Sequence, residues 1–243
     1  MPQTPVALLH GVGLDSTMWE PVRDALKRDS VAIDLPGHGR QGALTRPASL
    51  ADLAADVLDR LPQRSHLVGF SLGALIAQYI ARFHPDRVET LTCVSSVCHR
   101  TEAESQAVLA RLAAAESDFN ATVDASIDRW YTGTSVPLKV VEATRHTLAA
   151  NDVASFVHAY RVFAVGDAVL GPELAHITVP TLAVTGELDP GSTPEMTRRL
   201  AEAIPGAKSL VVPGSRHMLP VQDADVLAGA INDFIQESEG ERA

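Results

Sequence analysis

The chain has 243 residues, of which 46% are hydrophobic and 21% charged, and its formal net charge is −10. This length is enough for one sizeable core, and the charge argues against nucleic acid as a partner, because phosphate binding needs clustered lysine and arginine. The chain has only two cysteines, no run of about 18 apolar residues and no basic-then-apolar leader, so we expect a cytoplasmic protein with no membrane segment.

Short apolar runs along the chain predict buried strands. They show little alternation of polar and apolar residues, which is typical of strands that are covered on both faces. Helical patterns such as residues 49–60 and 72–83 separate them, so we predict an α/β fold with a mainly parallel sheet of about six strands flanked by helices. The apolar runs are residues 6–10, 31–34, 66–69, 88–94, 181–184 and 209–212.

The alternation of strands and helices stops in residues 97–177, which carry amphipathic helical patterns. Because strands resume afterwards, we predict a helical cap inserted after the fourth strand. The core is then formed by residues 1–96 and 178–243. Ligands bind at the carboxyl ends of the strands in open α/β sheets, so the cap should cover the binding site.

The segment Gly69-Phe70-Ser71-Leu72-Gly73 is a G-x-S-x-G sequence between an apolar run and a helical pattern. That context is the one in which a sharp strand-to-helix turn exposes a serine hydroxyl. The helix that follows points unpaired N–H groups at the reacting centre. We therefore predict that Ser71 is a nucleophile.

A serine nucleophile needs a base and an acid that orients the base. His217 follows the last predicted strand, and Asp189 follows the strand before it, so both should reach the same sheet edge. The chain order Ser71, Asp189, His217 is that of α/β-hydrolases. Glu187 is the rival acid, and because it lies nearer to the end of its strand we rank it second.

Two backbone N–H groups should form the oxyanion hole that stabilises the tetrahedral intermediate. We expect one from Leu72 and the other from Val12, in the turn after the first strand. His10 begins that turn, and we interpret it as a structural residue that braces the turn.

These motifs occur in the order found in the α/β-hydrolase superfamily, which the chain resembles over nearly its whole length. The resemblance implies that Ser71 attacks a carbonyl, that His217 takes its proton, and that Asp189 stabilises the imidazolium. Residues 129–167 resemble the cap of 3-oxoadipate enol-lactonases, whereas residues 7–97 also resemble the pimeloyl carrier-protein methyl ester esterases. A menaquinone-pathway synthase, which uses this triad as a lyase, is a third similar protein. The matching segments are residues 10–13 with Trp19, residues 34–39, 69–73 and 186–189, and His217.

Among the departures from the family pattern, two bear on the sheet and on the candidate site. Many members begin with an antiparallel hairpin, but the first predicted strand here starts near Val6, so we expect no hairpin. Arg216 stands where glycine or alanine usually precedes the histidine. Its charge is predicted either to contact a substrate carboxylate or to face solvent.

The resemblance to enol-lactonases implies a substrate that bears a carboxylate, and arginine suits such a group. Arg129, Arg145 and Arg161 lie in the cap, and we select Arg145 and Arg161, with Trp130 as an apolar wall, as candidate substrate-binding residues. No pair of histidines shows metal-ligand spacing and no phosphate-binding loop occurs, so we expect neither metal nor cofactor.

We therefore predict a serine hydrolase that cleaves a small carboxylic ester or an enol-lactone through an acyl-enzyme. One alternative is a carbon–carbon hydrolase or lyase with the same triad. Met218 argues against a carbon–carbon hydrolase, because those enzymes often carry tryptophan after the histidine. The other alternative is a non-catalytic ligand receptor on this fold.

Overall fold

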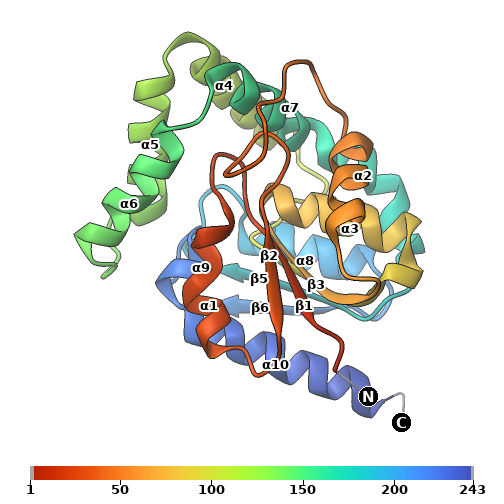
Figure 1. Ribbon diagram of the computed structural model, residues 1–243. Helices are drawn as coiled ribbons and strands as arrows, with labels where there is room; N and C mark the ends of the chain where they lie inside the picture. The colour runs from red at the N-terminus through yellow and green to blue at the C-terminus, as the bar shows by residue number, and fades with distance from the viewer. Residues whose placement is uncertain (1–2, 242–243) are drawn as a thin grey trace.

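A single sheet of six strands lies at the centre of the computed structural model, which describes residues 3–241 (Figure 1). All its neighbouring strands are parallel, in the order β2-β1-β3-β4-β5-β6, so the predicted fold class is confirmed. Within residues 3–241, no antiparallel hairpin precedes the first strand. The predicted core also includes residues 1, 2, 242 and 243, and that part of the prediction lies outside the described residues. The strands are β1 (Val6–Leu9), β2 (Ser30–Ile33), β3 (Ser65–Phe70), β4 (Val88–Val94), β5 (Thr181–Gly186) and β6 (Lys208–Val212).

Helices cover both faces of the sheet (Figure 1). On one face α1 (Glu20–Ala25) packs against α10 (Ala224–Gly240), and on the other α3 (Leu72–Phe83) lies between the sheet and α2 (Leu50–Arg60), with α8 (Pro194–Ala203) against β5. Every residue of β1, β3 and β5 is buried, which explains their continuous apolar sequences. The short elements are η1 (Ser16–Trp19), η2 (Pro85–Arg87), η3 (Gly171–His176) and α9 (Leu219–Gln222).

Four helices occupy the chain between β4 and β5, and we refer to residues 97–177 as the cap segment. They are α4 (Glu102–Ser117), α5 (Phe119–Tyr131), α6 (Leu138–Ala149) and α7 (Val153–Leu170). Side chains of Thr101, Asp118 and Asp152 accept hydrogen bonds from the first-turn N–H groups of α4, α5 and α7. α7 packs on α3 and α4, whereas α6 packs chiefly on α5 and lies farther from the sheet (Figure 1).

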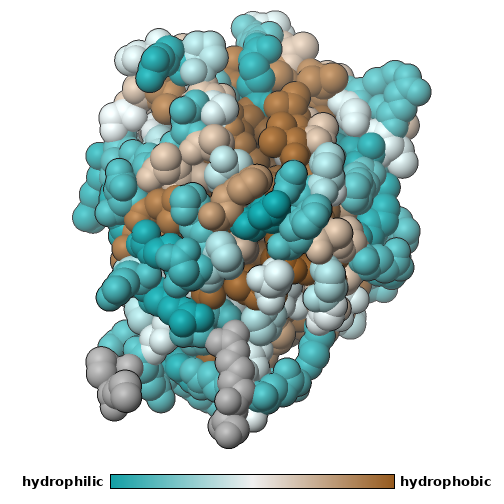
Figure 2. All heavy atoms as spheres, turned by 90° about the vertical axis from the view of Figure 1, so that its right-hand side faces the viewer, coloured by the Kyte–Doolittle hydropathy of each residue, from teal (hydrophilic) through white to brown (hydrophobic). Residues whose placement is uncertain are grey.

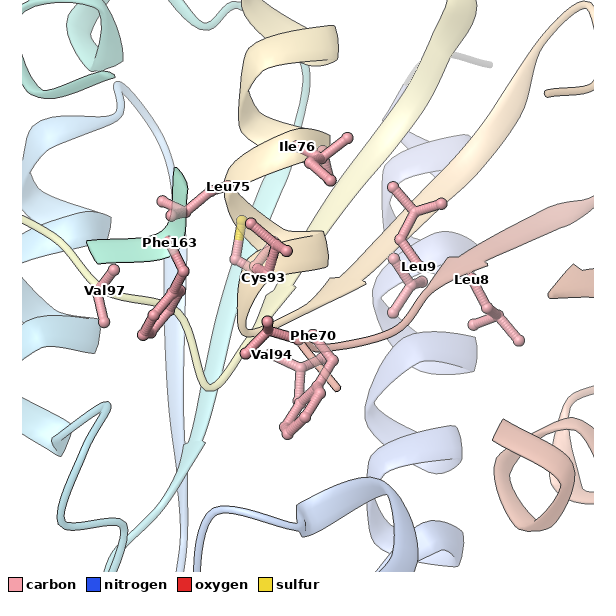
Figure 3. Packing of buried hydrophobic residues seen from close by; sticks show 14 of the residues in the cluster. Leu8, Leu9, Phe70, Leu75, Ile76, Cys93, Val94, Val97 and Phe163 are labelled. Carbon is pink, nitrogen blue, oxygen red and sulfur yellow. The ribbon is translucent and has the colours of Figure 1, made fainter. Parts of the chain in front are cut away.

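The contact between α7 and α3 joins the cap segment to the core. Figure 3 shows Phe163 of α7 beside Leu75 of α3 and Val97, which follows β4. All three side chains are buried. Burial of a side chain of this size contributes roughly 1.5–3 kcal/mol to folding, so α7 is held firmly on the carboxyl ends of the strands.

One helical stretch, Val153–His176, is long and apolar enough to cross a membrane, judged by length and composition alone. Arg161 and Asp167 interrupt its apolar residues, so it contains no continuous apolar run of membrane-spanning length. In the structure 56% of its most apolar window is buried. Packing against α3 and α4 therefore accounts for its composition. On the face turned toward the viewer in Figure 2, hydrophilic side chains cover most of the surface and apolar ones show between them.

Candidate active site

Ser71 occupies a strained turn between β3 and α3. Its backbone angles, φ 53° and ψ −112°, lie in a region that residues other than glycine rarely adopt. The Ser71 N–H donates a hydrogen bond to the Val94 carbonyl at 3.0 Å, which ties the turn to the neighbouring strand. The turn therefore holds the serine at the carboxyl edge of the sheet, with the residue 4% exposed.

The two glycines of the G-x-S-x-G sequence are required by close backbone approach. A Cβ on Gly69 would lie within 3.0 Å of the Gly73 carbonyl, and a Cβ on Gly73 would lie within 3.0 Å of the Leu9 and His10 carbonyls. Real Cβ atoms essentially never approach backbone this closely. The motif therefore describes how tightly α3 starts against β1 and β3.

Asp189 and His217 form a buried hydrogen-bonded pair. Asp189 follows β5 and His217 follows β6, and 2.7 Å separates Asp189 Oδ2 from His217 Nδ1. The other carboxylate oxygen of Asp189 accepts N–H groups of Gly191 and Ser192, both at 2.9 Å. Burial alone would raise the pKa of Asp189, but the charge and hydrogen bond of His217 and the two N–H groups hold it below its ordinary value.

An ionised Asp189 determines the tautomer of His217. Nδ1–H donates to the carboxylate, and Nε2 is thereby left as the acceptor. The rival acid Glu187 is exposed and accepts the Gly214 N–H at 3.0 Å, so it is engaged away from the imidazole.

Two aromatic rings flank the imidazole of His217. The Phe70 centroid lies 4.9 Å from it, and Trp130 of α5 stacks on it at 5.8 Å with 27° between the planes. Ser95 also donates to the His217 carbonyl at 3.3 Å. The core and the cap segment together therefore restrict the orientation of this ring.

Ser71, Asp189 and His217 line one cavity of about 40 Å³. Within residues 3–241 no hydrogen bond joins the Ser71 hydroxyl to His217. In unliganded enzymes such contacts are often long and shorten only when substrate binds. The Ser71 and His217 side chains thus line the same cavity, and substrate binding would have to bring them into hydrogen-bond contact.

The predicted oxyanion donors lie at the same edge. Val12 lines the cavity, and Leu72 is the first residue of α3, where no intrahelical acceptor exists. The Gly73 N–H donates to the His10 carbonyl at 3.1 Å, which fixes the turn after β1 against the start of α3. The Val12 and Leu72 amides have no hydrogen-bond acceptor in the part of the chain that the structure describes.

The neutral ring of His10 braces the turn after β1. Its Nδ1–H donates to the Gly11 carbonyl at 2.7 Å, and its Nε2 accepts the Leu35 N–H at 2.8 Å. Burial is the main cause that lowers the pKa of His10, to about 3, with the charge of His38 lowering it further. His10 therefore acts in the structure and does not reach the cavity.

Of the three predicted substrate-binding residues, only Trp130 lines the cavity. Arg145 is ion-paired with Asp124 and Glu142, and Arg161 with Glu116 at 2.6 Å. Neither arginine reaches the cavity, so their selection is corrected. Carboxylates on the cap surface hold both guanidinium groups outside.

The sequence did not point to three further polar residues of the cavity wall, Arg111, Tyr160 and Ser192, and Arg129, which also lines it, was considered but not selected. Arg129 adjoins Trp130 in the sequence, which was the only available signal. Arg216 was predicted either to contact a substrate carboxylate or to face solvent. Its Nη1 donates to the Arg129 carbonyl at 3.0 Å and so links the His217 loop to α5.

The described residues contain no group of three or more histidine, cysteine, aspartate or glutamate side chains that could hold a metal ion. Both cysteines, Cys93 and Cys98, are buried and free. The cavity contains the polar groups that acyl transfer uses: a hydroxyl, an imidazole–carboxylate pair and backbone N–H groups.

The strand order and helix layers are those of the α/β-hydrolase class of fold. The chain belongs to the alpha/beta hydrolase family, since that family's model matches residues 6–230. This confirms the resemblance and the enzyme class predicted from the sequence.

Several known proteins are similar over nearly the whole chain. A (E)-2-((N-methylformamido)methylene)succinate hydrolase of Acinetobacter baylyi is 29% identical, with 96% of this chain and 90% of that protein covered. A pimeloyl-[acyl-carrier protein] methyl ester esterase of Edwardsiella ictaluri is 30% identical, with 94% and 92% covered. The crystal structure of the enol-lactonase from Burkholderia xenovorans is 26% identical and superimposes with a TM-score of 0.86, with 97% and 92% covered.

Proposed function

We propose that this protein is a serine hydrolase that cleaves a small carboxylic ester or lactone through an acyl-enzyme. Ser71 is the nucleophile, His217 the general base and acid, and Asp189 the residue that orients His217. The observation that carries the proposal is the Asp189–His217 pair, which faces the same cavity as the strained Ser71.

The proposed reaction has two balanced halves. Ser71 Oγ bonds to the carbonyl carbon while its proton passes to His217 Nε2, and the resulting oxyanion accepts the Val12 and Leu72 N–H groups. The C–O bond to the leaving alcohol then breaks, and the alcohol takes the proton from His217. Water attacks the acyl-enzyme in the same way and releases the acid and the free serine.

The names of the similar proteins support an ester or lactone substrate. One is an esterase that acts on a methyl ester, another is an enol-lactonase, and a third is a hydrolase of a succinate derivative. All share most of their length with this chain, which supports a reaction of the same kind.

The proposal is tested with a fluorophosphonate probe and with p-nitrophenyl acetate. We expect covalent labelling at Ser71, identified by mass spectrometry of the modified peptide, and turnover of the ester. A folded protein that takes no label and turns over no ester would contradict the proposal and favour a ligand receptor.

A further inference from the structure

Two hollows meet at the cap segment, and three residues line both of them. The inner one is the cavity of about 40 Å³ at Ser71, and the outer one measures about 360 Å³. Their shared residues are Arg111 of α4, Arg129 of α5 and Tyr160 of α7. Most of the outer wall consists of small alanine, serine and threonine side chains from α4 and α5.

The inner cavity has space for only about three water molecules. Sites for small organic ligands usually occupy about 300–1,000 Å³, so the inner cavity can hold little more than the reacting group. The outer hollow, which shares Arg111, Arg129 and Tyr160 with the inner cavity, is the neighbouring space for the remainder of a substrate.

The two arginines at this boundary differ from the other cap arginines in having no carboxylate partner. Arg111 Nε donates to the Tyr160 hydroxyl at 3.2 Å, and Arg129 donates to the Ala125 carbonyl at 3.4 Å and the Ser126 hydroxyl at 3.1 Å. Among residues 3–241, no carboxylate pairs with either. The other cap arginines, Arg100, Arg145 and Arg161, each hold at least one.

No carboxylate of residues 3–241 forms an ion pair with either guanidinium at the boundary, and Asp118, which lines the outer hollow, accepts the Ala121 N–H instead. Burial and the neighbouring charge of Arg111 lower the pKa of the Arg129 guanidinium. Asp189 attracts Arg129, but both Asp189 oxygens already accept hydrogen bonds. Two half-buried cations that face the same space form a site for an anion, and a guanidinium fork matches a carboxylate in particular.

We infer that Arg111 and Arg129 bind a carboxylate of the substrate at the boundary between the inner cavity and the outer hollow. The substrate is then an acidic ester or lactone whose carboxylate lies several bonds from the reacting carbonyl. Hydrolysis of that substrate depends on the proposed function, whereas binding of the anion does not.

Kinetics on matched esters test the specificity. The wild type should have a higher kcat/KM for monomethyl glutarate and monomethyl adipate than for methyl valerate and methyl hexanoate. Arg111→Gln and Arg129→Gln should each lower this preference by about 10- to 100-fold, mainly through KM, because each removes a charge-assisted hydrogen bond. Arg111→Lys and Arg129→Lys should restore part of it, and Arg161→Gln should leave it unchanged. Equal losses for acidic and neutral esters would overturn the inference.

Calorimetry separates this inference from the proposed hydrolysis. Glutarate should bind the wild type and Ser71→Ala, and should bind Arg111→Gln and Arg129→Gln at least about tenfold more weakly. Glutaramide, which has the same length without charge, should bind none of them measurably. Glutarate binding without turnover of any ester would contradict the proposed function alone. Ester turnover without arginine-dependent glutarate binding would contradict the carboxylate site alone. Circular dichroism of each variant establishes that it is folded.

Discussion

The two walls of the cavity are built by different means. On the core side, Ser71 follows β3 directly, and Asp189 and His217 lie in the short loops after β5 and β6. Backbone hydrogen bonds at the strand ends hold these segments in place. On the cap side, Trp130 and Arg129 project from a helix that reaches the site through side-chain packing. We therefore expect changes on the core side to abolish chemistry and changes on the cap side to alter selectivity.

The largest effect should come from Ser71→Ala. Removal of the nucleophile should lower kcat for p-nitrophenyl acetate by roughly 10⁴- to 10⁶-fold, leaving only the contribution of binding and the oxyanion donors. Ser209→Ala, an exposed change on β6, is the matched control and should retain full activity. A loss of less than tenfold in Ser71→Ala would remove Ser71 from the mechanism.

Asp189→Asn should lower kcat by roughly 10⁴-fold, because an amide favours the wrong tautomer of His217. Glu187→Gln should retain kcat within about twofold, since its carboxylate accepts the N–H of Gly214 in a loop and no other hydrogen bond within residues 3–241. Steady-state kinetics of both variants decide between the two acids. The reverse ranking would assign the role to Glu187.

On the cap side, Trp130→Ala should lower kcat by about 10- to 100-fold, because the ring that stacks on His217 is lost and the base is less well oriented. Trp130→Phe should retain most of the activity. Tyr131→Phe is the control, since the Tyr131 hydroxyl hydrogen bonds Thr144 away from the cavity. If Trp130→Ala has wild-type kcat, the cap segment does not contribute to positioning the base.

The smallest effect concerns stability on the core side. The pKa of His10 is about 3 in the folded protein against 6.5 ordinarily, so below pH 6.5 the unfolded chain binds a proton that the folded chain does not. The contribution of neutral His10 to the free energy of unfolding is therefore fully present above about pH 6.5 and is lost as the pH falls toward 3. Urea unfolding should show a free energy of unfolding about 2 kcal/mol lower at pH 5 than at pH 7 from His10 alone. His10→Gln should reduce this difference, whereas the exposed His176→Gln should not. An unchanged difference in His10→Gln would show that other groups cause it.

The same contrast explains what the sequence could predict. The end of a strand and a tight turn are determined by short segments of sequence. Short motifs and their order in the chain therefore predicted Ser71, Asp189 and His217, and the apolar runs predicted the six strands. Whether an arginine on a helix faces the site depends on how that helix rotates and on which carboxylates other elements bring near it. Glu116 on α4 and Asp124 on α5 bind Arg161 and Arg145, and neither pairing has a signature in the sequence.

The hydrogen bond from Arg216 to the Arg129 carbonyl adds a second link between α5 and the His217 loop, beside the stacking of Trp130 on the imidazole. It links the residue before His217 to the last turns of α5, the helix that carries both Trp130 and Arg129. Any outward displacement of α5 must either break this bond or pull on the loop that holds the imidazole. Admission of a ligand past the cap and alignment of the base are thus mechanically linked through the Arg216 guanidinium as well as through the Trp130 ring.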